Sequence, residues 1–184
     1  MKTALALGTF DGLHKGHREV LRLPDGCKKI AVIFPLPPKA LITGKPLALM
    51  LPQDKETALK DLGIDEIFTL DFEKVRTMPP EDFLRLLTDK FSPDLISCGF
   101  NYRFGKNAAG DKNLLEDFCK ERGIALKCSE PVTENGETVS STEIRHFLQS
   151  GETEKANRLL YKPFSYTAEV ISGDKRGRTL GFPT

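Results

Sequence analysis

Apolar and polar positions alternate along the chain in blocks that predict strands separated by helices. Short apolar runs, typical of buried strands, cover residues 3–7, 29–34, 65–70, 94–98 and 124–128. Apolar residues at helical spacing predict helices over residues 53–62 and 111–122, from Pro79 through Leu87, and from Ser140 to a stop at Gly151. Five strands that alternate with helices predict an α/β fold with a doubly wound parallel sheet.

A glycine-rich turn with two histidines lies between the first predicted strand and a helix expected to start near Val20. Its sequence, over residues 8–19, is GTFDGLHKGHRE. In an open α/β sheet, a strand's carboxyl end and the following helix N-terminus form the ligand crevice, where backbone N–H groups attract phosphate. Glycine lets the backbone approach a ligand closely, and His14 and His17 can donate hydrogen bonds to phosphate oxygens. A phosphate site is therefore expected here.

Other interpretations of this turn have less support. A metal site is the weaker alternative, because no further histidine and no Cys-x-x-Cys pair supplies ligands. The turn is neither a Walker A loop nor a Gly-x-Gly-x-x-Gly loop.

Composition and charge narrow the class of protein. The 184 residues suffice for one sizeable domain, and 39% hydrophobic with 29% charged residues is typical of a soluble globular protein. The net charge of +1 gives no basis for nucleic-acid or membrane binding, and no apolar run reaches transmembrane length. No secretory signal opens the chain, and we expect a cytoplasmic protein.

The four cysteines match no metal motif, and we interpret them as reduced thiols, with disulfides as the alternative. They are Cys27, Cys98, Cys119 and Cys128.

The loop after the fourth predicted strand carries a second set of candidate residues. Its sequence, over residues 99–110, is GFNYRFGKNAAG, and it lies on the carboxyl-end side of the sheet. Phe104 or Tyr102 could pack against a planar ring, and Asn101 could recognise donors and acceptors of a base. The alternative is an ordinary connecting loop.

A third candidate segment, SSTEIR over residues 140–145, opens the last predicted helix. Ser140 and Glu143 fit a capping box, so the segment can be explained as a helix cap alone. Two hydroxyls and an arginine at a helix N-terminus also make an anion site, in which Arg145 would pair with two phosphate oxygens.

These motifs together resemble those of a known enzyme family. HKGH at residues 14–17 resembles the His-x-Gly-His signature of the nucleotidyltransferase superfamily. GTFDGLH at residues 8–14 resembles the narrower family of bacterial bifunctional riboflavin kinase/FMN adenylyltransferases, also called FAD synthetases. The loop over residues 99–105 resembles that family's Gly-x-Asn/Asp-Phe-x-Phe-Gly element, and SSTEIR resembles its Ser-Ser-Thr-x-x-Arg element.

The resemblance implies a Rossmann-like nucleotidyltransferase fold with a five-stranded parallel sheet over residues 1–162. The tail, which includes GFPT at residues 181–184, resembles the opening of a riboflavin kinase domain, so residues 163–184 are expected to be its incomplete start. Within this tail, residues 166–171 (YTAEVI) predict a strand of alternating type. Kinase activity is expected only in a full-length chain.

The implied reaction is adenylyl transfer from ATP to FMN, which gives FAD and pyrophosphate, with Mg²⁺ bridging phosphates. The implied catalytic residues are His14, His17, Ser141, Thr142 and Arg145. The implied nucleotide- and flavin-binding residues are Gly8, Thr9, Phe10, Asp11, Gly12, Gly16, Asn101 and Phe104. No residue is expected to ligate a metal directly.

Two alternatives stay open at this point. The chain could be another nucleotidyltransferase, with pantetheine phosphate or a nicotinamide nucleotide as acceptor, or a flavin- or nucleotide-binding fragment without turnover. FPLPP at residues 34–38 departs from the Phe-x-Pro-His-Pro run of many family members, so a histidine associated with the substrate site is missing. ATP and FMN are the expected partners, with no nucleic acid and no membrane, and the sequence does not indicate an oligomeric state.

Overall fold

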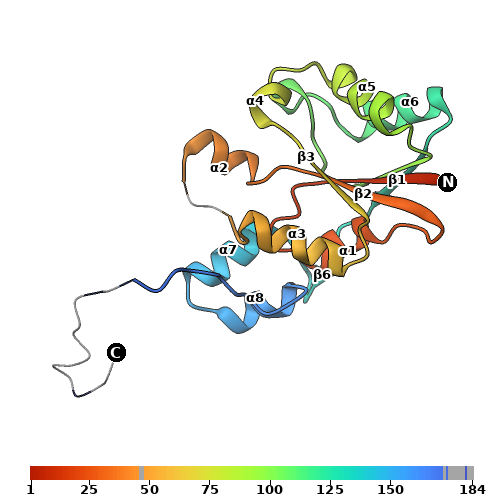
Figure 1. Cartoon of the computed structure of the whole chain (residues 1–184). Coiled ribbons are helices and arrows are strands. Elements are labelled where there is room, and N and C mark those ends of the chain that lie inside the picture. Colours follow the sequence, from red (N-terminus) through yellow and green to blue (C-terminus); the bar gives the residue numbers. More distant parts are fainter. Residues whose placement is uncertain (46–47, 172, 174–180, 182–184) are drawn as a thin grey trace.

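The protein is organised around one parallel sheet, with β1 at its centre (Figure 1). The computed structural model describes residues 1–45, 48–171, 173 and 181. The strands of the sheet are β1 (Lys2–Leu7), β2 (Cys27–Ile33), β3 (Glu66–Thr69), β4 (Leu95–Gly99) and β5 (Ala125–Ser129). All neighbours are parallel and the order is β3-β2-β1-β4-β5, which confirms the predicted doubly wound α/β fold. The winding reverses at β1, and ligands of such sheets bind beyond the carboxyl ends at that point.

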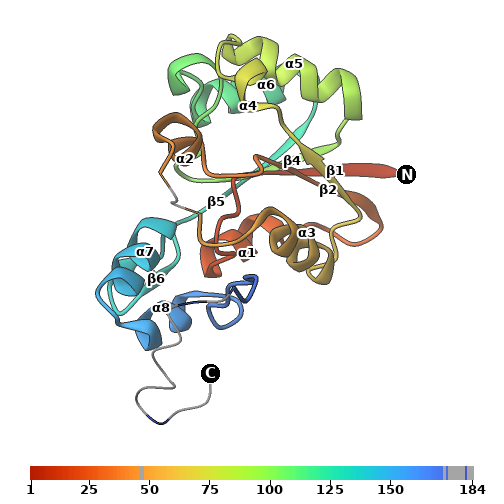
Figure 2. The same ribbon diagram turned by 60° about the vertical axis from the view of Figure 1, so that its left-hand side comes forward.

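Helices cover both faces of the sheet because side chains alternate along each strand. On one face, Leu5 and Leu7 belong to a core cluster with residues of α5 and α6, such as Phe83. On the other, Ala4 and Ala6 belong to a cluster with residues of α1 and α3. Figures 1 and 2 show these two helical layers. The bounds are α1 (Lys15–Leu21), α3 (Pro52–Asp61), α4 (Phe72–Val75), α5 (Pro80–Phe91) and α6 (Lys112–Arg122).

A smaller helical unit lies beside the carboxyl edge of the sheet (Figure 2). It consists of the hairpin β6 (Thr133–Glu134) and β7 (Glu137–Thr138) with α7 (Ser141–Gln149) and α8 (Thr153–Leu159). Ile144 and Ala156 form its core together with Leu49 from the other part of the chain. The N–H of Tyr161 donates to the carbonyl of Leu13 at 3.1 Å, so this unit is fastened to the turn after β1.

Two expectations about the elements were wrong, and three short helices were missed. The first helix begins at Lys15 and not near Val20, so His17 lies in its first turn. Residues 166–171 form no strand, and Val170 is 98% exposed. A strand needs a neighbour for its backbone hydrogen bonds, and no described segment pairs with this one. The short helices α2 (Pro38–Thr43), α4 and α8 were not predicted. The GFPT element lies outside the described residues apart from Gly181.

The packing of the turn after β1 can be tested with two glycines. Gly12 has a φ of +83°, and a Cβ there would lie 2.8 Å from Cδ1 of Leu49. Gly123 has a φ of +66° and nothing within 4 Å of such a Cβ. Both alanine substitutions carry left-handed strain of about 1–2 kcal/mol, but only Gly12→Ala also overpacks the core, which costs about 1–3 kcal/mol. We expect urea denaturation to show a clearly larger loss of unfolding free energy for Gly12→Ala. Equal losses would contradict the tight packing of this turn.

Candidate active site

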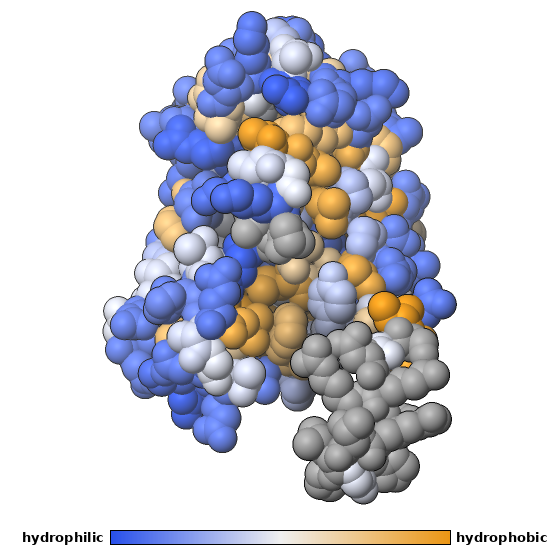
Figure 3. All heavy atoms as spheres, turned by 90° about the vertical axis from the view of Figure 1, so that its left-hand side faces the viewer, coloured by the Kyte–Doolittle hydropathy of each residue, from blue (hydrophilic) through white to orange (hydrophobic). Residues whose placement is uncertain are grey.

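A cavity of about 400 Å³ lies at the carboxyl edge of the sheet. Every strand contributes to its lining from its carboxyl end, through Gly8, Phe34, Leu70, Gly99 and Ser129. The N-terminus of α7 closes another side. Figure 3 views the molecule from the side to which the strands run, and hydrophobic residues gather in the middle of that face between polar margins. The cavity occupies the place where an open α/β sheet binds its ligand.

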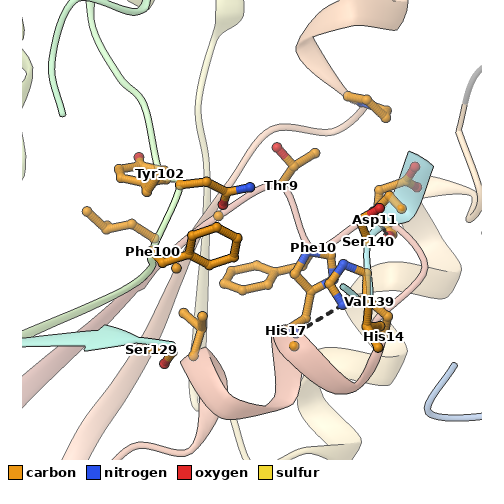
Figure 4. A pocket seen from close by; sticks show the side chains of 18 of the residues that line it. Thr9, Phe10, Asp11, His14, His17, Phe100, Tyr102, Ser129, Val139 and Ser140 are labelled. Atoms are coloured by element: carbon orange, nitrogen blue, oxygen red, sulfur yellow. Dashed lines mark hydrogen bonds between the residues drawn. The ribbon is translucent and has the colours of Figure 1, made fainter. Parts of the chain in front are cut away.

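His14 and His17 stack against each other on one wall of the cavity (Figure 4), with ring centroids 3.6 Å apart. The rings of Phe10 and His17 pack edge to face, with centroids 5.4 Å apart. Nδ1 of His14 accepts the backbone N–H of His17 at 3.3 Å, which caps α1. In the neutral ring the proton is then on Nε2, so Nε2 of His14 is a hydrogen-bond donor.

Both imidazoles are neutral at pH 7. Burial lowers the pKa of His14 to about 4, with a smaller contribution from the charge of Arg145. Burial also lowers the pKa of His17 well below its ordinary value, and the charges of His14 and Lys55 act in the same direction. The two histidines therefore offer N–H donors to a ligand, and not positive charges.

Asp11 joins the turn to two distant segments. It is 2% exposed, and its carboxylate accepts the backbone N–H groups of Leu49 at 2.9 Å and Met50 at 3.3 Å. The guanidinium of Arg145 donates to the same carboxylate at 2.5 Å. The backbone carbonyl of Asp11 accepts the hydroxyl of Ser141 at 2.8 Å. Burial raises the pKa of Asp11, while the N–H of Leu49 and the charge of Arg145 oppose that rise.

The N-terminus of α7 is both a cap and a wall of the cavity. The hydroxyl of Ser140 accepts the N–H of Glu143 at 3.2 Å, as the capping interpretation predicts. Ser141 and Thr142, the first two residues of α7, line the cavity together with Arg145. The cap leaves these side chains at the helix N-terminus, where partial positive charge favours an anion. The cap is therefore confirmed, and the anion site stays a prediction with which the cap is compatible.

Of the two aromatic candidates in the loop after β4, Tyr102 lines the cavity and Phe104 does not. Phe100, Asn101 and Tyr102 line the cavity, whereas Phe104 is 5% exposed and belongs to the core. Phe104 packs on Phe83 with centroids 5.6 Å apart. The loop turns back at this point, because the backbones of Phe104 and Gly110 pair with each other. A direct contact between Phe104 and a ligand is not supported by this placement.

The remaining sequence-predicted residues divide between the cavity and its surroundings. Gly8, Thr9, Phe10, Asp11 and Gly16 line it, and Gly12 does not. Gly12 instead lines a second cavity, of about 220 Å³, between α3 and residues 160–167.

Sequence reasoning missed Ser129 and Lys55. Ser129 ends β5, and its hydroxyl is enclosed without a hydrogen-bond partner in the described part of the chain. Its position at a strand's carboxyl end was a usable signal. Lys55 shares helical spacing with the buried Ala58 and Leu59, which was a signal for a buried lysine.

The chain is similar in sequence to proteins of a known family. A family model described as FAD synthetase matches residues 1–143. The chain belongs to the FAD synthetase family. The chain is 32% identical to the bifunctional riboflavin kinase/FMN adenylyltransferase of Bacillus subtilis, over 100% of its own length and 61% of the relative. It is 30% identical to the Escherichia coli K12 protein of the same name, over 98% of its length and 61% of the relative. It thus spans about three fifths of these curated relatives.

A solved structure shares the fold of this chain. The crystal structure of a protein from Streptococcus pneumoniae, described as a macrolide-efflux protein, superimposes with a TM-score of 0.84 at 28% identity. The match covers 99% of this chain and 62% of the other. Among the described residues, no helix has the length and apolar character needed to cross a membrane.

The low pKa of His14 makes the stability of the protein depend on pH. Between pH 6.5, its unfolded value, and about 4, its folded value, only the unfolded chain binds this proton. Acidification across that window therefore removes roughly 3 kcal/mol of unfolding free energy through His14. His14→Asn keeps a helix-capping side chain. We expect this variant to lose less unfolding free energy on acidification, as measured by urea denaturation at each pH. The exposed His146, changed in the same way, is the control. An unchanged fall in His14→Asn would contradict the buried neutral ring.

Proposed function

We propose that the chain transfers the adenylyl group of ATP to FMN and forms FAD and pyrophosphate. A phosphate oxygen of FMN attacks the α-phosphorus of ATP, and the bond from that phosphorus to the bridging oxygen of the β-phosphate breaks. The FMN phosphate is already ionised, so no general base is needed. Such a reaction relies on positioning and on charge stabilisation more than on covalent chemistry. The cavity provides those two features.

The observation that carries the proposal is the placement of two sets of donors around one cavity. Nε2 of His14 and the ring of His17 lie on one wall, and the N-terminus of α7 lies on another. The histidine donors suit the α- and β-phosphate oxygens, where negative charge develops in the transition state. Arg145 with Ser141 and Thr142 would hold the departing pyrophosphate. A guanidinium has five N–H donors, so Arg145 can keep its bond to Asp11 while it binds phosphate.

The opposite side of the cavity suits the rings of the substrates. Phe100 and Tyr102 present aromatic surface beside Asn101, whose amide could recognise a base edge. Phe104 would act from behind by supporting Tyr102, with which its ring stacks at 5.7 Å. Gly8 has no room for a side chain, because a Cβ there would lie 2.9 Å from the Phe10 ring.

Mg²⁺ is proposed to arrive with ATP. No described group of three or more His, Cys, Asp or Glu side chains could hold a metal ion. Mg²⁺ commonly keeps several waters and binds through substrate phosphates. We place the reaction in the cytoplasm, where ATP and FMN are available.

The decisive experiment incubates the 184-residue chain with ATP, Mg²⁺ and FMN and follows FAD by chromatography. We expect FAD and pyrophosphate in equal amounts. His14→Ala removes a donor to the charge that develops in the transition state, so kcat should fall on the order of 100-fold. Such a fall would assign the activity to this site. Pantetheine phosphate and a nicotinamide nucleotide serve as competing acceptors. Tight ATP binding without pyrophosphate release would favour a binding module, and turnover only with another acceptor would reassign the substrate.

Arg145 provides a second test of the proposed phosphate site. Arg145→Lys keeps the positive charge but replaces a planar fork by a point charge, so it cannot hold Asp11 and phosphate in the same way. We expect kcat/KM to fall at least tenfold, which corresponds to about 1.4 kcal/mol. Arg158→Lys, on the exposed side of α8, is the matched control and should be unchanged. Near-normal kinetics in Arg145→Lys would reduce the segment to a helix cap.

A further inference from the structure

Lys55 is a fully buried lysine that the proposed chemistry does not use. It lies in α3 with 0% of its surface exposed. Its Nζ donates to three backbone carbonyls, of Thr9 at 3.0 Å, Phe34 at 3.1 Å and Pro35 at 3.2 Å. An ammonium group has three N–H donors, so all of them are engaged within the chain. Lys55 therefore has no donor left for a phosphate and can affect a ligand only through other residues.

The three carbonyls belong to the two segments that leave the centre of the sheet. Thr9 follows β1, and Phe34 and Pro35 follow β2. Among the described residues, the backbone hydrogen bonds between β1 and β2 end at the N–H of Gly8, which donates to the carbonyl of Val32 at 3.3 Å. Beyond that bond, the two segments are connected by the hydrogen bonds that the ammonium group of Lys55 donates to both of them. Thr9 and Phe34 both line the proposed active site, so the tie lies directly behind its wall.

The charge of Lys55 also matters at this place. Burial of a charged group costs several kcal/mol, and an apolar side chain could fill the same volume without that cost. Burial lowers the pKa of Lys55 to about 8, and the charge of Asp11 opposes this fall. Among the described residues, the charge of Lys55 also lowers the pKa of His17, which is neutral, and Arg145 pairs with Asp11. Two cations thus share one carboxylate, and the excess positive charge lies behind the turn that would face a triphosphate.

We propose that Lys55 is a positioning residue for adenylyl transfer: its ammonium ties the end of β1 to the end of β2 and holds the Thr9–Asp11 turn in the shape that receives the nucleotide phosphates. This inference rests on the proposed function. It differs from direct phosphate binding by a lysine, because every donor of Lys55 is used by a carbonyl.

The first test compares Lys55→Met with Lys60→Met in FAD formation by the whole chain. Methionine keeps an unbranched stem of similar size but has no donor and no charge, and Lys60 is an exposed lysine of the same helix. A misplacement of about 1 Å at a reacting centre can cost on the order of 100-fold. We expect a fall of that order in kcat/KM for Lys55→Met, with kcat accounting for most of it, and a change below about twofold for Lys60→Met, as for an exposed site. A Lys55→Met enzyme within about twofold of the wild type would overturn the proposal.

The second test is the pH dependence, which a purely structural role would not produce. Since kcat/KM reports groups of the free enzyme, it should fall in the wild type as pH rises through about 8, where Lys55 loses its proton. Phosphate bound near the ammonium raises this pKa, so the fall in kcat should begin at higher pH. Lys55→Met should lack the alkaline fall. The same fall in Lys55→Met, or none in the wild type, would overturn the proposal.

These measurements also separate the inference from the proposed function. A wild-type chain that forms no FAD refutes the proposed function, whereas an active wild type with an active Lys55→Met refutes only the role of Lys55. Should Lys55→Met fail to fold, Lys55→Arg replaces it, because a guanidinium stays charged throughout this pH range. The alkaline fall should then disappear in Lys55→Arg, and its persistence would overturn the proposal.

Discussion

The buried carboxylate of Asp11 is the constraint on which the active site depends. A carboxylate without partners would cost several kcal/mol in this environment, so its hydrogen bonds dictate where neighbouring segments lie. It accepts the N–H groups of Leu49 and Met50 and the guanidinium of Arg145. Its backbone carbonyl accepts the hydroxyl of Ser141. One residue of the turn after β1 therefore fixes the position of α7, and with it the distance across the cavity.

The same turn is held from behind by Lys55, and His14 caps the helix that follows it. In the proposed reaction, this arrangement would let the site work with neutral histidines. Positive charge is supplied by Arg145 and, behind the turn, by Lys55, while His14 and His17 supply directed N–H donors. Preorganised donors that need no rearrangement during the reaction are an effective way to stabilise charge that develops on phosphate oxygens.

The sequence predicts the sheet well because its strands are short, largely apolar runs, and the central strands β1, β2 and β4 are buried on both faces. It also predicts which loops gather at the carboxyl edge, since parallel strands bring them together. It fails where a residue's direction depends on tertiary contacts. Phe104 belongs to the core because its backbone pairs with Gly110, a pairing that no local pattern specifies. Lys55 is buried because three carbonyls from elsewhere surround its Nζ, and residues 166–171 have strand composition but no partner among the described residues.

The most direct test of the account is a crystal structure of the chain with FMN and an ATP analogue whose α–β bridge cannot be cleaved. The account predicts that the α-phosphate lies within hydrogen-bond distance of Nε2 of His14. It also predicts that the terminal phosphates lie at the N-terminus of α7, against Thr142 and Arg145, while Arg145 still contacts Asp11. Nucleotide phosphates bound away from both the histidine pair and α7 would contradict it.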